Sequence, residues 1–391
     1  MVLPLELIDE IIRYLVGDVR SLRRCSLVAK PWMHLCRKWL FNDVFITKKT
    51  HQPWLNRISA RDTDLLRNIR SFTFIYDPMV WGRITPYRID SLYRYLSGLS
   101  RLESLGLSSM FLGPEVLQQI GLCSSFQHTL KSLSLTGCNA TPSAFTTLIN
   151  YFPGVRKLEF KSLTCEADGL PAPPLSRPLR GKLSIVEGKI RDQALFNKLS
   201  NPPPELDELS LESVYSPFFY ECVVGGNVKH LRITKSVRGD AGMSWGLTYL
   251  SNAHEPTTGH FPDLTHCQAL RELEICSLPF EQDEMSLLAS ITSTNLRKIT
   301  IPARYHQFQW MSDPTFLRYY ETIDDNLYQL VRRLRGSGYK HRLEVAFRVG
   351  RKKNADHWEM DFKEFLPKFR EQGRVMVVER PGERVIYCSD R

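Results

Sequence analysis

Residues 130–135 read Leu-Lys-Ser-Leu-Ser-Leu, a hexamer in which the first, fourth and sixth positions are apolar. Its second half alternates apolar and polar residues, which is typical of a β-strand with one buried face. The same spacing recurs through the body of the chain and predicts a series of similar strands. The other complete copies are Ile69-Phe72-Phe74, Leu102-Leu105-Leu107, Val155-Leu158-Phe160, Leu206-Leu209-Leu211, Val228-Leu231-Ile233, Leu270-Leu273-Ile275 and Leu296-Ile299-Ile301, and partial copies are Leu183-Ile185, Leu343-Val345 and Val375-Val377.

Segments with the apolar spacing of helices lie between these strands, several of them after a capping residue or a proline. They are residues 89–96, 114–120, 142–151, 192–199, 281–291 and 313–334. Many strands follow one another at intervals of about 22 to 33 residues, close to the period of leucine-rich repeats. We therefore expect an α/β fold in which residues 47–391 form an irregular leucine-rich-repeat-like solenoid with parallel strands. The alternative is a doubly wound sheet, which would normally show fuller apolar runs and a glycine-rich first turn.

Side chains at the third and fifth positions of each hexamer are expected to point away from the core and to line the inner face of the solenoid. The earlier copies carry small neutral residues there, as in Ser104, Gly106, Ser132 and Ser134. Later copies carry charges of mixed sign, as a peptide-binding surface would. The charged candidates for target binding are Lys157, Glu159, His230, Arg232, Glu272, Glu274 and Lys298. A plain solvated sheet is the alternative for each of them.

Two proline-containing segments, 168–181 and 252–266, interrupt the repeats and are predicted to be loops. Long loops on a rigid scaffold often bind partners, and unstructured insertion is the alternative. The formal charge of +10 is unevenly distributed, because the window 332–353 contains many Lys and Arg residues and the single acid Glu344. Such a window favours an acidic partner, and a solvated helix end followed by a basic strand is the alternative.

The N-terminal residues 3–15 have the apolar stripe of an amphipathic helix, opened by Pro4. Asp18 is placed to cap a second helix, which is predicted to carry Val28 inward. A third helix is expected to begin near Pro31. Three short helices make a small core, so part of their apolar surface is expected to contact another body.

The order of these residues resembles an F-box. The matching stretches are Leu3-Pro4-Leu5-Glu6-Leu7-Ile8, Ile11-Ile12, Leu15, Cys25-Ser26-Leu27-Val28 and Lys30-Pro31-Trp32. The resemblance implies that residues 1–46 bind the Skp-type adaptor of a cullin complex. The adaptor-binding residues that it implies are Leu3, Pro4, Leu7, Ile8, Ile11, Val28 and Trp32. Pro31 departs from the pattern, which more usually has a polar residue before the Trp. The alternative for these helices is an N-terminal cap for the repeats.

The composition, 42% hydrophobic and 24% charged over 391 residues, is ordinary for a folded protein. No apolar run reaches membrane-spanning length, and acids within the first helix argue against a secretory signal. The nine cysteines are scattered, which indicates reduced thiols and a cytoplasmic or nuclear location. Because no phosphate-binding glycine loop, nucleophile elbow or Cys/His cluster occurs, we expect no catalytic residue, metal or cofactor.

The resemblance and the repeats together imply a non-catalytic substrate-recognition subunit of an SCF-type (cullin-RING) ubiquitin ligase. The F-box would bind the adaptor and the repeats would bind a target protein. Two alternatives stay open. One is a leucine-rich-repeat interaction scaffold without a ubiquitin role. The other is a nucleic-acid-binding protein that uses the basic window 332–353, where the lack of interleaved aromatic residues argues against it.

Overall fold

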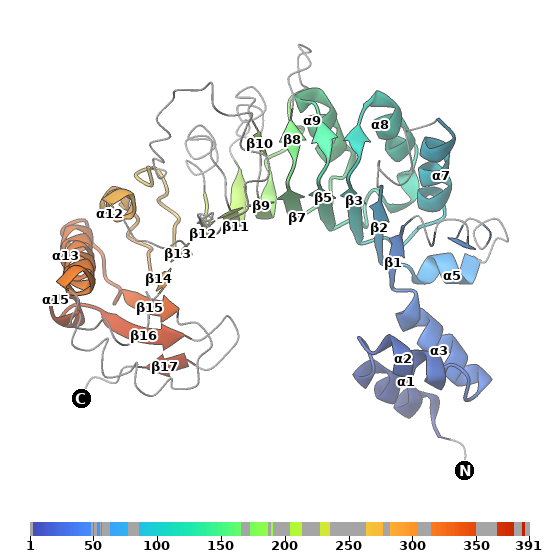
Figure 1. The fold of residues 1–391 in the computed structure, drawn as a ribbon, viewed down its shortest axis with the longest axis horizontal. Helices are drawn as coiled ribbons and strands as arrows, with labels where there is room; N and C mark the ends of the chain where they lie inside the picture. The colour runs from blue at the N-terminus through green and yellow to red at the C-terminus, as the bar shows by residue number, and fades with distance from the viewer. Residues whose placement is uncertain are drawn as a thin grey trace. The chain divides into compact units, whose positions relative to one another are not determined.

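The computed structural model of the chain describes residues 3–47, 50, 53–54, 56, 63–76, 86–165, 173–186, 189–190, 204–212, 227–234, 263–276, 282–302, 314–348, 366–378 and 385–387. Two compact units form, one from residues 1–176 with 188–198 and the other from residues 177–187 with 199–391. Both combine helices with mostly parallel strands, which confirms the predicted α/β class (Figure 1).

The first unit begins with three helices, and the chain then alternates strands with helices. Its elements in chain order are α1 (Leu5–Tyr14), α2 (Val19–Cys25), α3 (Lys30–Leu40), β1 (Asp43–Ile46), α5 (Thr63–Asn68), β2 (Ser71–Ile75), α7 (Pro86–Ser97), β3 (Ser104–Ser108), β4 (Phe111–Leu112), α8 (Pro114–Gly121), the 3-10 turn Ser124–Phe126, β5 (Ser132–Thr136), β6 (Asn139–Ala140), α9 (Pro142–Tyr151), β7 (Lys157–Lys161), β8 (Thr164–Cys165) and β10 (Lys189–Ile190). The helices therefore share a unit with the first strands, and the domain boundary at residue 46 stays a prediction.

The main sheet of the first unit stacks equivalent hexamer positions. Strands β1, β2, β3, β5 and β7 hydrogen-bond in this order and all run parallel. Leu133 pairs with Leu105 on one side and with Leu158 on the other, and all three are buried. Helices α7, α8 and α9 lie on one side of these strands (Figure 1) and bury residues such as Tyr95 and Phe145. The apolar hexamer positions and the inner helix faces thus make one continuous core.

A tight turn follows each of β3, β5 and β7 and leads into a second parallel sheet, β10-β8-β6-β4. Equivalent turn residues have a left-handed backbone, with φ of 57° at Ser109, 59° at Gly137 and 51° at Ser162. Glycine adopts this conformation without a steric penalty, whereas serine adopts it at a modest cost. Neighbouring turns are joined, because Ser109 N donates to Thr136 O and Gly137 N donates to Lys161 O, both at 2.7 Å. The repeated turn keeps successive copies in register.

Gly154→Ala is expected to lower the free energy of unfolding by about 1–3 kcal/mol, because it introduces an overpacked contact. A Cβ at Gly154 would lie 2.8 Å from Leu130 O and 3.0 Å from His128 O, which are main-chain atoms. Gly336→Ala is the matched control, since no heavy atom lies within 4 Å of a Cβ built there. Urea denaturation followed by circular dichroism measures both variants. Equal stability of the two would contradict the close approach at Gly154.

The second unit contains the remaining strands and the longest helix. Its elements are β9 (Arg180–Val186), β11 (Glu205–Glu212), β12 (His230–Thr234), β13 (Glu272–Ile275), α12 (Gln282–Ser290), β14 (Lys298–Pro302), α13 (Pro314–Gly336), β15 (Glu344–Arg348), α15 (Pro367–Arg370), β16 (Arg374–Val378) and β17 (Val385–Tyr387). Strands β9 to β16 pair in parallel, and β17 pairs antiparallel with β16. One buried apolar row crosses the parallel strands, from Leu183 through Leu231 and Ile299 to Val375.

Asp324 of α13 ties this helix to α15. Its side chain is 2% exposed, and its two oxygens accept hydrogen bonds from Lys368 N at 3.0 Å and Phe369 N at 2.8 Å. These amides lie at the start of α15, where backbone donors have no partner within the helix. Burial raises the pKa of the Asp324 carboxyl, and the two amide donors oppose that rise. A carboxylate from a distant segment therefore caps a helix of four residues.

Most predicted elements are confirmed where the structure describes them. Every complete hexamer lies at a strand, and the partial copies lie at β9, β15 and β16. Five predicted helices correspond to α7, α8, α9, α12 and α13, whereas 192–199 lies outside the described residues. Of the predicted loops, residues 173–179 and 263–266 have neither helix nor strand, but the last residues of the first one begin β9. The remaining loop residues, 168–172 and 252–262, lie outside the described part.

Two side-chain predictions are wrong. Val28 does not point inward, because α2 ends at Cys25 and Val28 is exposed in the following turn. Gly106 does not line an open face, because the side chain of Thr73 covers it, and a Cβ at Gly106 would lie 2.8 Å from Thr73 Oγ1. Among the described residues, no helix is long and apolar enough to cross a membrane.

Candidate functional site

The three N-terminal helices enclose a small core of their own. Ile8 and Ile12 of α1 meet Leu22 of α2 and Cys36 of α3, and all four side chains are buried. Asp18 caps α2, because its Oδ1 accepts hydrogen bonds from the amides of the two residues Arg20 and Ser21, at 3.0 and 3.1 Å. The apolar side of α1 that faces this core is narrow. The other apolar residues of α1 are exposed on the surface.

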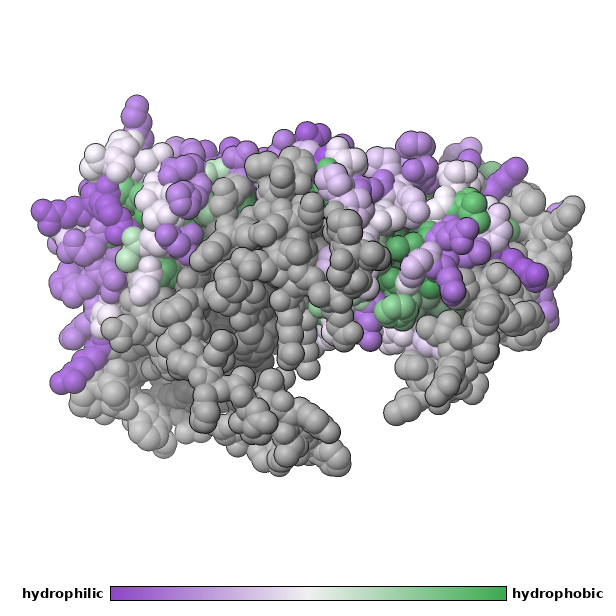
Figure 2. All heavy atoms as spheres, turned by 90° about the horizontal axis from the view of Figure 1, so that it is seen from above, coloured by the Kyte–Doolittle hydropathy of each residue, from purple (hydrophilic) through white to green (hydrophobic). Residues whose placement is uncertain are grey.

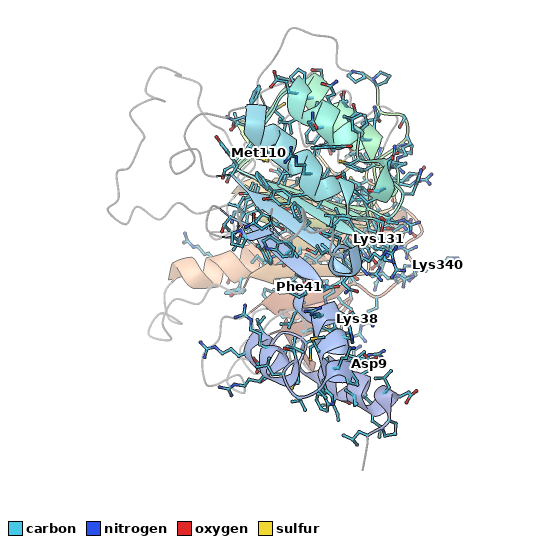
Figure 3. The ribbon with its side chains drawn as sticks, turned by 90° about the vertical axis from the view of Figure 1, so that its right-hand side faces the viewer. Asp9, Lys38, Phe41, Met110, Lys131 and Lys340 are labelled. Carbon is cyan, nitrogen blue, oxygen red and sulfur yellow. The ribbon has the colours of Figure 1, made fainter. Side chains whose placement is uncertain are left out.

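The last of these helices continues almost directly into the sheet of the first unit. Only Phe41 and Asn42 separate α3 from β1, and Figure 3 labels Phe41 at this junction. Asn42 O accepts hydrogen bonds from Arg70 N and Ser71 N, both at 2.9 Å. The Phe41 ring stands edge-on against the Trp54 ring, with 6.1 Å between their centroids. The junction is thus held by main-chain and aromatic contacts.

Large apolar side chains are exposed on the N-terminal helices far more than elsewhere. Among the described residues, the exposed ones outside positions 3–28 are Phe45, Phe111 and Leu122. Those within positions 3–28 are Leu3, Leu5, Leu7, Ile11, Tyr14, Val16, Val19, Leu27 and Val28, which we call the N-terminal apolar surface. Single exposed apolar residues are normal, whereas such a concentration is typical of a binding surface.

The structure places the seven predicted adaptor-binding residues in three different settings. The side chains of Leu3, Pro4, Leu7, Ile11 and Val28 are exposed on the helices or beside them. Ile8 is only 5% exposed and belongs to the small core. Trp32 is half-buried and packs against that core from α3. Five of the seven are therefore accessible to a partner, while Ile8 holds α1 in place.

Two strongly exposed apolar residues were absent from the predicted set. Tyr14 is 81% exposed and Leu27 is 85% exposed. Leu7, Ile11 and Tyr14 are spaced i, i+4 and i+7, so they form one stripe along α1. That spacing is visible in the sequence and would have identified Tyr14. Leu27 carries no comparable signal, because its exposure follows from the turn in which α2 ends.

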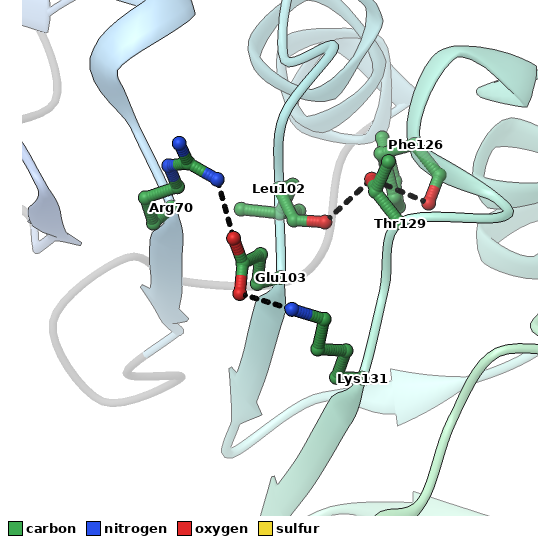
Figure 4. Close-up of polar contacts among 6 residues, drawn as sticks. All are labelled: Arg70, Leu102, Glu103, Phe126, Thr129 and Lys131. Carbon is green, nitrogen blue, oxygen red and sulfur yellow. Dashed lines mark hydrogen bonds and ion pairs between the residues drawn. The ribbon is translucent and has the colours of Figure 1, made fainter.

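The candidate residues of the first unit lie at the last strand of its main sheet. Lys157 and Glu159 alternate along β7, and Lys157 Nζ lies 3.1 Å from Glu159. A second ionic group lies where β2, β3 and β5 begin, and there Glu103 contacts both Arg70 and Lys131 (Figure 4). Lys131 and then Arg70 lower the pKa of the Glu103 carboxyl. These charges are largely satisfied within the sheet.

The candidates of the second unit lie on three adjacent strands. His230 of β12 pairs in register with Glu272 of β13, which pairs with Lys298 of β14. Arg232 and Glu274 form the next row, with Arg232 Nε 3.6 Å from the Glu274 carboxylate. The first row continues across the sheet as Lys182, Glu208, His230, Glu272, Lys298, Glu344 and Arg374. The register thus assembles five of the seven predicted target-binding residues into one charged surface.

Cysteines give no sign of a reactive centre in the described part of the chain. Cys267 is buried, and burial raises its pKa to about 12. Cys276 Sγ donates to the Glu274 carboxylate at 2.9 Å, beside Arg232. Within the described residues, no group of three or more His, Cys, Asp and Glu side chains is arranged to hold a metal ion. No protein-family model and no curated protein matches this chain.

Proposed function

We propose that this chain is an F-box protein with a leucine-rich-repeat-like receptor domain. It would act as the substrate-recognition subunit of an SCF-type ubiquitin ligase in the cytoplasm or nucleus. The N-terminal helices would bind the Skp-type adaptor, and the parallel sheets would hold a target protein. The chain itself would catalyse no step. It would hold a lysine of the target near a conjugating enzyme that carries ubiquitin, which raises the effective concentration of that lysine at the enzyme.

The concentration of exposed apolar side chains within residues 3–28 is the observation that carries this proposal. Fully burying one exposed Leu, Ile or Val side chain contributes about 1.5–3 kcal/mol, so burying several residues of the N-terminal apolar surface would favour association. The residues that resemble the F-box pattern and that are exposed, such as Leu3 and Ile11, belong to this surface. The repeated strands support the receptor role, because they present charged rows on a regular scaffold.

A scaffold without a ubiquitin role is the second candidate. Two observations favour it, the contact of Phe41 with Trp54 and the hydrogen bonds that Asn42 O accepts. They attach the helices to the first strands, as is expected of a capping unit. In that case the N-terminal apolar surface would bind some other protein. The two candidates differ in whether the adaptor binds.

Titration of the purified full-length chain with a purified Skp-type adaptor tests the proposed function. We expect a one-to-one complex by calorimetry and by size-exclusion chromatography with light scattering. Binding should show a negative heat-capacity change, because apolar surface is buried. A folded chain that forms no complex with the adaptor would exclude the F-box assignment and leave the scaffold.

A further inference from the structure

Three cations occupy equivalent positions just before three neighbouring strands of the second unit. Lys229 precedes β12, Arg271 precedes β13 and Arg297 precedes β14. Arg271 N donates to Lys229 O and Arg297 N donates to Arg271 O, both at 2.7 Å, so the three residues lie side by side across the sheet. Adjacent strands are about 4.8 Å apart, which places the three charges close together. We call these three residues the basic edge.

The charges of the basic edge are only partly neutralised. Lys229 Nζ lies 2.7 Å from Asp207 and lowers the pKa of that carboxyl. Arg271 and Arg297 are exposed, and neither pairs with a carboxylate in the described ranges of the chain. The first unit also has cations before its strands, but there Glu103 joins Arg70 to Lys131. Two adjacent guanidinium groups that pair with no carboxylate among the described residues therefore distinguish the second unit.

The backbone that carries these two arginines is held firmly. The buried hydroxyl of Ser293 lies 2.8 Å from both Leu270 O and Gln268 O, which share its single proton. The buried phenol of Tyr339 donates to Leu296 O at 2.7 Å. The residues Leu270 and Leu296 immediately precede Arg271 and Arg297. Each guanidinium thus extends from a fixed position, which reduces the entropy lost when a ligand binds.

The surroundings extend the positive charge. Arg335 donates to Gln372 O at 3.3 Å and Arg342 donates to Gly373 O at 3.1 Å, and both of these acceptors are neutral carbonyls. Lys340 is exposed and lies at the margin of the molecule in Figure 3. Figure 2 shows hydrophilic side chains, which include both acids and bases, over the part of this unit around α13 at its left.

Asp207, the partner of Lys229, is level with the basic edge, whereas Glu272 and Glu344 lie one residue further into the sheet. Glu272 follows Arg271 on β13, and Glu344 begins β15. Glu344 lies 3.8 Å from Arg374 of β16, the next strand away from the basic edge. The Asp263 carboxylate accepts a hydrogen bond from Thr265 N at 2.9 Å. A short anionic group at the edge would therefore meet cations, whereas a long polyanion crossing the face would meet acids.

We propose that the basic edge binds an acidic segment of a protein target, with a carboxylate or phosphate group held between Arg271 and Arg297. The planar guanidinium group matches both anions through paired N–H donors. This inference rests on the proposed function in treating the bound protein as the target of the ligase. A peptide is favoured over nucleic acid because, in the described part of the second unit, no large apolar side chain is exposed on which bases would stack.

Fluorescence anisotropy with the full-length chain tests the inference. The probes are a labelled Glu-rich peptide, the same peptide with phosphoserine at the Glu positions, a Gln version and a single-stranded oligonucleotide of equal charge. We expect the Glu or phosphoserine peptide to bind, more weakly as salt increases, and the Gln peptide not to bind. The stronger of the two acidic peptides identifies the anion.

The double variant Arg271→Gln with Arg297→Gln should weaken peptide binding by roughly tenfold to a hundredfold. Arg70→Gln with Lys131→Gln is the matched control, because it removes the same net charge from the equivalent position of the first unit. It should leave the affinity nearly unchanged. Arg271→Lys with Arg297→Lys should retain part of the affinity, which separates loss of charge from loss of folding.

Three outcomes would overturn the inference. These are absence of binding to both acidic peptides, equal losses in the two glutamine double variants, and tighter binding of the oligonucleotide through the same arginines. Adaptor titration of the same protein preparation shows whether the proposed function fails as well. Intact adaptor binding would confine the failure to the basic edge.

Discussion

A full-length chain carrying Leu7→Asp and Ile11→Asp is expected to lose at least about a hundredfold in affinity for a Skp-type adaptor, since each change removes burial energy and places a charge in an apolar interface. Leu7 and Ile11 are neighbours on the exposed stripe of α1, and both are more than 40% exposed. Neither belongs to the small core of Ile8, Ile12, Leu22 and Cys36, so the helices should remain folded. Calorimetric titration measures the affinity, and circular dichroism verifies the fold.

The control for this variant makes the same chemical change elsewhere. Phe111 and Leu122 are exposed apolar residues of the first unit outside the N-terminal helices. A chain with Phe111→Asp and Leu122→Asp should bind the adaptor as the unmodified chain does. Undiminished binding of the Leu7→Asp, Ile11→Asp chain would remove the N-terminal apolar surface from the interface. Equal losses in both variants would point to a general effect of added negative charge.

Asp324→Ala is expected to reduce the stability of the second unit by about 2–4 kcal/mol, because two amides of α15 lose their acceptor. The amide of Phe369 is buried, and that of Lys368 is partly buried, so water cannot fully replace the carboxylate. Hydrogen exchange detected by mass spectrometry should show faster exchange over residues 366–378. Urea denaturation gives the accompanying loss of stability.

The neighbouring residue Asp325 is the control for that variant. Its carboxylate forms an ion pair with Lys368 Nζ, and both side chains are more than half exposed. Exposed ion pairs contribute little to stability. Asp325→Ala should therefore leave the exchange pattern almost unchanged. If the two variants exchange alike, the cap provided by Asp324 does not stabilise α15.

The repeated strands could be predicted from two features of the sequence, the alternation of residues within each hexamer and the recurrence of hexamers along the chain. Alternation of apolar and polar residues in a copy such as Leu133-Ser134-Leu135 indicates a strand with one buried face. The recurrence of that copy at similar intervals indicates that the strands stack. The parallel register of β3, β5 and β7 then follows, because it places equivalent leucines beside one another.

Features that depend on distant segments could not be predicted in this way. The capping role of Asp324 requires α15, which lies more than 40 residues further along the chain. The basic edge requires the register that places Arg271 beside Arg297. The exposure of Val28 has a local cause, because α2 ends at Cys25 although the apolar spacing continues past it. A contact with a distant element decides the role of Asp324, and the apolar spacing within α13 carries no information about that contact.

The short junction at Phe41 and Asn42 has a mechanical consequence. A connection of two residues, fastened by Asn42 O to the start of β2, does not act as a flexible tether. Under the proposed function, an adaptor that fixes the orientation of the N-terminal helices would also fix the orientation of the sheet of the first unit. A protein bound to that sheet would therefore face the conjugating enzyme in one orientation. That orientation would then determine which lysines of the bound target are modified.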